Sequence, residues 1–161
     1  MTHQDLSQGS AGNVGKVADL LGGPAVLRHT LSRSIEVHDL LLDGLPVRAV
    51  GALIANLRVL NFQKTASLDG AVGMSLRTFQ RHKEQATTKT LSQEQSGKAW
   101  KFAETLSRAT SVFGSQEEAE TWLDRPALGL DGRRPIDLLA TPAGVELVEE
   151  FLTRLEYGVY V

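Results

Sequence analysis

The sequence contains no cysteine and few aromatic residues, which make up 6% of its 161 residues. Without cysteine the chain has no disulfide framework and no thiolate that could bind a metal or act as a nucleophile. Long apolar runs are also missing: those at residues 40–42 and 50–53 fall far short of the roughly 20 residues that cross a bilayer. No basic cluster precedes an apolar run near the N-terminus, so no secretory signal is predicted. We therefore expect a soluble, cytoplasmic protein that does not enter a membrane.

The net charge of −2 is small, but the charges are distributed unevenly. Residues 76–101 carry six basic side chains against two acidic ones, a net charge of +4, and residues 117–161 carry four arginines against ten acidic side chains, a net charge of −6. Because phosphate binding needs a local group of cations rather than a basic total, this asymmetry indicates two surfaces with different partners. The alternative is that both regions are only solvated surface.

The N-terminal part has weak signals for secondary structure. With 42% hydrophobic residues the chain can bury a core, and its length allows one or two small domains. Residues 1–15 are polar and rich in glycine and serine, so they are expected to be disordered. Residues 17–42 predict two short helices, or a helix and a loop. A clearer helix opens at Gly44-Leu45-Pro46, because apolar residues follow at three- and four-residue spacing.

The C-terminal half has stronger helix signals. Two pairs have the spacing of a capping box, namely Ser92 with Gln95 and Ser115 with Glu118. Gly114 predicts the end of the helix that starts at the first pair. Pro135 and Pro142 are placed to begin a one-turn helix and a long last helix. Only residues 157–161 favour extended structure, so the predicted fold class is all-α.

Residues 65–84 fit a DNA-reading helix-turn-helix. Gly73 would take the left-handed turn between the helices, and Phe79 would anchor the second helix to the first. Arginine and glutamine suit base edges in the major groove, while lysine and the helix cap contact phosphates. The candidate DNA-binding residues are Ser75, Arg77, Thr78, Gln80, Arg81 and Lys83.

Two features depart from this pattern. Asp69-Gly70 occupy positions where a helix-turn-helix usually has alanine and a good helix former, and His82 replaces an apolar residue. The alternative is a plain helical hairpin with a solvated basic face.

The motifs from Phe113 onward carry a resemblance to a known family. They are Phe113-Gly114, Glu118-Ala119, Trp122-Leu123, Pro126-Ala127-Leu128, Gly132-Arg133-Arg134-Pro135-Ile136-Asp137-Leu138-Leu139, Thr141, Gly144 and Arg154-Leu155-Glu156-Tyr157-Gly158-Val159-Tyr160. Together with Gly44-Leu45-Pro46 and residues 75–81, they resemble the Xre/MbcA/ParS antitoxins over about residues 44–161.

The resemblance implies a dimeric, helical, DNA-binding antitoxin encoded beside a RES-domain toxin that consumes NAD or transfers ADP-ribose from it. A disordered segment at 1–15 would precede an Xre-like helix-turn-helix domain at 16–90, which represses the shared promoter by binding operator DNA. A toxin-binding domain at 91–161 would end in a tail that occludes the toxin's NAD pocket. By position, the candidate toxin-binding residues are Arg154, Glu156, Tyr157, Gly158, Val159, Tyr160 and Val161.

The composition of this tail agrees with a contact surface. It has two tyrosines, two valines and no lysine, and aromatic anchors dominate protein interfaces. A free terminus can also enter a pocket that is closed to a loop. The alternative is that Tyr157 and Val159 fold back onto the chain's own core.

Nothing in the sequence predicts a catalytic centre. The four histidines are scattered, and the acidic residues, Glu120 among them, are expected on helix starts or outer faces, so neither a metal site nor a catalytic carboxylate pair is predicted. Trp100 and Trp122 lie on apolar stripes, which indicates core or a dimer interface. Arg133 could help to hold an anion, or could brace its loop against Asp131 or Asp137. We expect no enzyme and no cofactor. The remaining alternatives are a stand-alone helix-turn-helix transcription regulator and an interaction module that no longer binds DNA.

Overall fold

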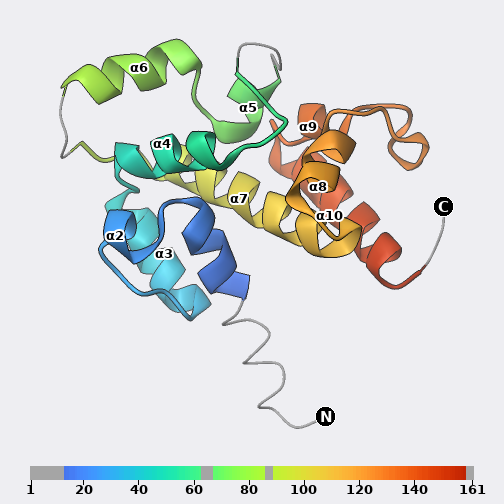
Figure 1. Ribbon diagram of the computed structural model, residues 1–161, viewed down its shortest axis with the longest axis horizontal. Helices are drawn as coiled ribbons and strands as arrows, with labels where there is room; N and C mark the ends of the chain where they lie inside the picture. The colour runs from blue at the N-terminus through green and yellow to red at the C-terminus, as the bar shows by residue number, and fades with distance from the viewer. Residues whose placement is uncertain (1–12, 63–66, 86–88, 159–161) are drawn as a thin grey trace, which may run out of the picture. The chain divides into compact units, whose positions relative to one another are not determined.

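The computed structural model describes residues 13–62, 67–85 and 89–158, and these ranges contain helices and two isolated β-bridges but no strand (Figure 1). The all-α prediction is therefore confirmed. In chain order the helices are residues 13–20, α2 (Gly23–Leu27), α3 (Ser34–Asp43), α4 (Val47–Asn56), α5 (Leu68–Val72), α6 (Leu76–Gln85), α7 (Gln93–Phe113), α8 (Gln116–Leu123), the 3-10 turn η1 (Leu128–Leu130), α9 (Pro135–Leu138) and α10 (Pro142–Glu156). None of the described helices is long and apolar enough to cross a membrane.

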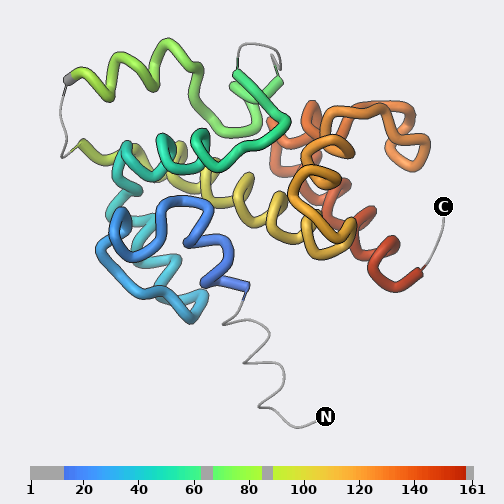
Figure 2. Tube along the Cα trace, viewed as in Figure 1, coloured from blue at the N-terminus to red at the C-terminus, as the bar shows by residue number. Residues whose placement is uncertain are grey.

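By its internal contacts the chain divides into two compact units, which can be followed along the trace in Figure 2. Unit 1 takes its described residues from Met1–Asn56 and Arg77–Glu104, and unit 2 takes them from Leu57–Leu76 and Thr105–Val161. This division differs from the boundary expected at residue 90, because α5 packs on α9 in unit 2 and α7 contributes residues to both units. The functional assignment of the two expected domains stays a prediction.

The N-terminal part of unit 1 is more helical than expected. Residues 13–15, which were expected to be disordered, are helical because Val14 and Val17 turn inward and are only 8% and 1% exposed. The rest of the expected disordered segment lies outside the described residues. Residues 13–43 form three helices, rather than two helices or a helix and a loop. The left-handed Gly22 separates residues 13–20 from α2, which has Pro24 in its first turn.

The motif Gly44-Leu45-Pro46 joins α4 to the segment before α7 within unit 1. The Leu45 amide donates to the buried hydroxyl of Ser96 at 2.8 Å, and its carbonyl accepts from the Leu91 amide at 2.8 Å. Gly44 has a φ of +93°, and a Cβ there would overlap the Leu91 carbonyl oxygen. Only glycine fits this close approach, so the turn that opens α4 depends on it.

The predicted helix ends in unit 2 are confirmed by their capping bonds. The Ser115 hydroxyl accepts from the Glu118 amide at 3.2 Å, and the Thr141 hydroxyl accepts from the Gly144 amide at 3.0 Å. Gly114 ends α7 with a φ of +93°. Pro135 and Pro142 lie in the first turns of α9 and α10. These local signals place α8, α9 and α10 in the order that the sequence predicts.

Glu120 of α8 is a buried carboxylate, contrary to the expectation that it lies on an outer face. Its side chain is completely buried and accepts hydrogen bonds from the backbone amides of Arg58, Val59 and Leu60 at 2.9–3.0 Å. Gln116 donates a further bond at 2.9 Å. The burial is possible because both carboxylate oxygens accept hydrogen bonds from nearby donors. Through these bonds residues 58–60 become part of the same unit as α8.

Candidate functional site

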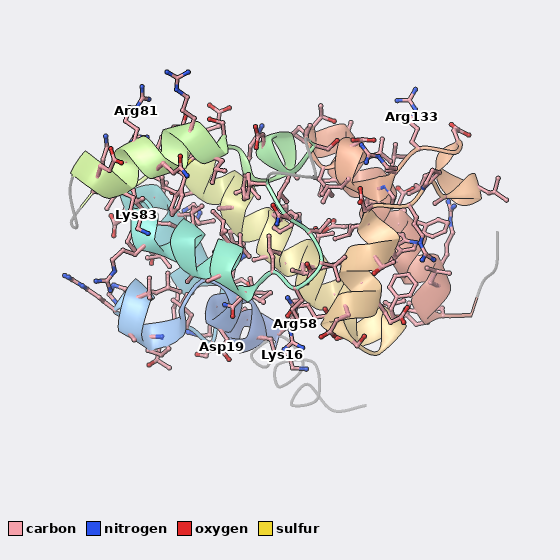
Figure 3. All side chains as sticks on the ribbon, turned by 45° about the horizontal axis from the view of Figure 1, so that its top comes forward. Lys16, Asp19, Arg58, Arg81, Lys83 and Arg133 are labelled. Carbon is pink, nitrogen blue, oxygen red and sulfur yellow. The ribbon has the colours of Figure 1, made fainter. Side chains whose placement is uncertain are left out.

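The basic face of unit 1 lies on α6. Arg77, Gln80, Arg81 and Lys83 are exposed, and Figure 3 shows Arg81 extending away from the helix. Two other candidate DNA-binding residues, Ser75 and Thr78, are half-buried. The helix follows a turn in which Gly73 adopts the predicted left-handed conformation with a φ of +84°. The structure therefore presents the cations of this segment to solvent on a regular helix.

Phe79 holds α6 against α4. Its side chain is half-buried, and a Cβ at Gly51 of α4 would lie 3.2 Å from the Phe79 ring. The anchor that the structure shows for Phe79 is thus α4, whereas the sequence predicted the first helix of the helix-turn-helix. The sequence did not predict that Phe79 packs on α4, because a glycine within a helix does not indicate which side chain packs against it.

His82 fills the position where an apolar residue was expected. Its side chain is half-buried, and its Nδ1 atom is buried without a hydrogen-bond partner among the described residues. Burial, together with the nearby cations Lys89 and Arg81, lowers the pKa of the imidazole. A neutral imidazole is compatible with an inward-facing position on a basic helix, so this departure from the motif has a physical explanation.

The presence of Asp69 and Gly70, the other departure from the helix-turn-helix pattern, is explained by the way α5 packs and ends. A Cβ at Gly70 would lie 3.3 Å from the Cβ of Ala140, which is closer than ordinary van der Waals contact, so glycine allows α5 to approach the residue that follows α9. The Asp69 carbonyl accepts from the Gly73 and Met74 amides at 2.9 and 3.1 Å and closes this five-residue helix. Since α5 and α6 belong to different units, their arrangement as a helix-turn-helix stays a prediction.

Three half-buried aromatic rings from α7, α8 and α10 pack against one another in unit 2. The centroids of Phe113 and Trp122 are 5.0 Å apart, and those of Trp122 and Phe151 are 5.8 Å apart and stacked. Arg108 of α7 donates to the Thr153 hydroxyl and lies 3.5 Å from a carboxylate oxygen of Glu156. These contacts fix the last turns of α10, which carry the candidate toxin-binding residues.

The chain turns at the end of α10 instead of becoming extended. Tyr157 has a φ of −90° and a ψ of 9°, and Gly158 has a φ of +71°, so the extended conformation predicted for these two residues is wrong. The capping amides of Tyr157 and Gly158 bond back to Thr153 and Leu155, which makes the turn favourable. The Tyr157 side chain is 78% exposed, so it does not fold back onto the core.

The other candidate toxin-binding residues extend this exposed end. Arg154, Glu156 and Gly158 are exposed as well. Val159, Tyr160 and Val161 lie outside the described residues. The described part of the end therefore offers one aromatic ring, one cation and one carboxylate that is held by Arg108.

Arg134, rather than Arg133, braces the loop before α9. Its guanidinium bonds to Asp137 at 3.0 Å, to Asp124 at 2.9 Å and to the Ser67 hydroxyl at 3.0 Å. Burial raises the pKa of Asp137, but hydrogen bonds from Ser67 and Arg134 outweigh it and hold that pKa below its usual range. The interpretation of Arg133 as the brace is wrong: Figure 3 shows its side chain pointing away from the ribbon.

Among the described residues no group of three or more metal-ligating side chains comes together. What the described residues of unit 2 do offer is an exposed helix end and a braced loop, both suited to contact with another macromolecule.

Comparison with known proteins gives one family model and two curated relatives. Residues 108–158 match the family model described as the antitoxin Xre/MbcA/ParS C-terminal toxin-binding domain. An Antitoxin Xre from Yersinia enterocolitica is 35% identical over 68 residues, which cover 42% of this chain and 46% of the relative. An Antitoxin Xre from Pseudomonas putida is 31% identical over 68 residues, which cover 42% of this chain and 43% of the relative.

The chain thus spans less than half the length of these curated relatives in the matched region. The matched region of the family model contains Arg108, the aromatic stack, the braced loop and the described part of the exposed end. Over residues 108–158 this match confirms the resemblance to the Xre/MbcA/ParS antitoxins that the sequence motifs indicated.

Proposed function

We propose that this protein is the antitoxin of a toxin–antitoxin pair, and that its C-terminal end neutralises a RES-domain toxin that consumes NAD or transfers ADP-ribose. The observation that carries the proposal is the match of residues 108–158 to a toxin-binding domain whose described end leaves Tyr157 exposed. Its role is regulatory rather than enzymatic, and it acts in the cytoplasm, where toxin, NAD and operator DNA are found together.

The mechanism that fits these residues is occlusion of the toxin's active site. The end of α10 is held by Arg108 through Thr153 and Glu156, so Tyr157 starts from a fixed position. Because the backbone at this position is already held, less conformational entropy is lost on binding, and the tyrosine ring can bury a large apolar area. Residues 157–161 would enter the pocket, and Arg154 would contact its rim.

Rescue of growth tests this mechanism. Cells that express the RES-domain toxin are expected to grow when the full chain is co-expressed and to stop growing when it ends at Glu156. Leu42→Ala, at an exposed position of α3 in unit 1, is the matched control and is expected to rescue fully. Rescue by the shortened chain, at equal protein level, would contradict occlusion by the tail.

The second part of the proposal is autoregulation through DNA. The exposed Arg77, Gln80 and Arg81 of α6 fit base edges, Lys83 fits a phosphate, and Ser75 and Thr78 lie at the start of the helix. We propose that a homodimer binds a two-fold symmetric operator through this helix. A filter-binding titration against the chain's own promoter tests it, and tight, sequence-specific binding is expected.

One observation favours an interaction module without DNA binding. The segment expected to be the first helix of the helix-turn-helix is only five residues long and packs on α9 in unit 2. Under that alternative, the same titration gives equal affinity for promoter and unrelated DNA while toxin neutralisation is unchanged.

A further inference from the structure

The loop before α9 presents the most exposed large apolar side chain of the described residues. Leu128 is 95% exposed, compared with 78% for Tyr157 and 57% for Ile35. A single exposed leucine is common on protein surfaces, so exposure alone shows no binding site. The conformation and packing of the loop are what distinguish Leu128 from the others.

The loop is closed by its own backbone hydrogen bonds. The Ala127 amide donates to the Arg133 carbonyl at 3.1 Å, and the Ala127 carbonyl accepts from the Leu130 and Gly132 amides at 3.0 and 2.9 Å. Asp131 and Gly132 adopt left-handed conformations, with φ of +56° and +72°. The backbone around Leu128 is therefore ordered by bonds within the loop, and it holds the side chain out in solvent.

The base of the loop is fixed to the rest of unit 2. Gly129 packs so closely on Phe151 of α10 that a Cβ would overlap the ring, and Leu130 is only 7% exposed. On the C-terminal side, Arg134 ties the loop to Asp124 and Asp137. Leu128 is thus held at a defined place on α10, the helix whose end carries Tyr157.

The charges of the loop differ from those around it. Residues 117–161 have a net charge of −6, yet Arg125 and Arg133 on either side of Leu128 are exposed and make no ion pair with a described residue. Asp131 is the one exposed acidic side chain within residues 125–133. An exposed leucine between unpaired arginines complements an apolar pocket with a carboxylate at its edge, and arginine is enriched at such contacts.

We propose that Leu128 and Arg133 form a second contact with the toxin, separate from the tail, in which Leu128 enters an apolar pocket and Arg133 pairs with an acidic side chain beside it. This inference rests on the proposed function. The toxin is the partner because the loop lies within the matched toxin-binding domain and packs directly on α10. Two contacts on one rigid unit raise the affinity together, since the second forms at a high effective concentration.

The absence of cysteine allows a direct test of this contact. Leu128→Cys introduces the only thiol of the chain, and Leu42→Cys introduces one at another exposed leucine, in unit 1. Each variant is alkylated with iodoacetamide, once alone and once with a saturating amount of the purified RES-domain protein that is encoded beside its gene. The alkylated fraction of the chain is measured over time by mass spectrometry. We expect alkylation at position 128 to slow at least about tenfold in the complex, while position 42 keeps its rate.

The outcomes separate this inference from the proposed function. Equal alkylation rates at position 128 with and without the RES-domain protein, in a complex shown by co-elution, would overturn the second contact and leave the antitoxin function standing. Failure of the wild-type chain to bind the RES-domain protein would overturn the proposed function itself. A third outcome is that alkylation at position 128 slows as the concentration of the chain itself rises, without the RES-domain protein. That result would assign the loop to self-association and contradict the proposal.

Affinity supplies the second readout. Leu128→Ser is expected to weaken binding of the RES-domain protein by about tenfold to a hundredfold, which is the loss that follows from removing one buried leucine. Leu42→Ser is expected to leave the affinity unchanged. Unchanged binding by Leu128→Ser would contradict the second contact. Because Leu128 is 95% exposed and contributes little to the core, the variant is expected to keep the thermal midpoint of the wild type.

Discussion

The basic helix of unit 1 and the C-terminal end of unit 2 are constructed in different ways. On α6 the cations Arg77, Arg81 and Lys83 point into solvent, and the helix is held by Phe79 packed on Gly51. In unit 2 the helix end is held by an aromatic stack and by Arg108. A surface of solvated cations attracts a polyanion over a distance and loses affinity in salt. A surface with an exposed aromatic ring on a held helix end binds at contact distance and depends on shape, so under the proposed function the two regions would bind two different partners.

Replacing Glu120 should have the largest effect on stability, because its buried carboxylate connects residues 58–60 to α8 within unit 2. Glu120→Ala leaves the buried Leu60 amide and the part-buried Arg58 and Val59 amides without this acceptor, and is expected to lower the free energy of unfolding by about 3 kcal/mol. Glu150→Ala, at an exposed position of α10, is the control and should change it by less than about 0.5 kcal/mol. Urea denaturation measures both. Equal midpoints for the two variants would show that the buried carboxylate does not hold the unit together.

The basic character of α6 can be tested one arginine at a time. Arg77→Ala and Arg81→Ala are each expected to weaken operator binding by about 1–3 kcal/mol. Where a phosphate contact is lost, the slope of the logarithm of the binding constant against the logarithm of the salt concentration should fall by about one. Gel shifts at several salt concentrations measure the effect. Both side chains are exposed, so the thermal midpoint should not change. Unchanged shifts for both variants would move DNA contact away from α6.

The two neighbouring arginines of the loop provide a matched pair. Arg134→Ala removes bonds to Asp124, Asp137 and Ser67 and is expected to lower the thermal midpoint, by an amount that the partial exposure of these groups keeps modest. Arg133→Ala is expected to leave stability unchanged and to weaken toxin binding. Thermal unfolding and binding titrations separate the two effects. The reverse pattern would contradict the assignment of Arg134 as the brace.

The smallest expected effect is a pH dependence from His82. Burial, Lys89 and Arg81 lower its pKa in the folded state, so below about pH 6.5 the unfolded chain binds more protons than the folded one at this position. The folded state therefore loses stability as the pH falls through this range. At higher pH, where His82 is neutral in both states, this destabilising effect is absent. His82→Gln should reduce the difference between urea midpoints measured at pH 7.5 and 5.5. An unchanged difference would exclude His82 as its source.

Sequence patterns predicted the parts of the fold that depend on neighbours along the chain. The caps at Ser115 and Thr141, and the turns at Gly73 and Gly114, follow from residues within four positions of one another. Such contacts are determined by backbone geometry, which residue type and spacing reveal.

Long-range contacts gave no such signal. The bond between Glu120 and the Arg58 amide joins residues 62 positions apart, and the packing of α5 on α9 has no counterpart in local spacing. Local spacing also could not decide between Arg133 and Arg134, because the choice depends on Asp124 and Ser67, which tertiary packing brings close. The candidate toxin-binding end was located by family resemblance, and its turned, exposed geometry came only from the structure.

The most direct test of the account is the affinity of the purified chain for the RES-domain protein encoded beside its gene, measured by calorimetry for the full chain and for the chain ending at Glu156. Tight binding by the full chain is expected, with a loss of at least about a hundredfold on shortening and an unchanged thermal midpoint. Equal affinity of the two chains would contradict the central claim that the C-terminal end is the main contact with the toxin.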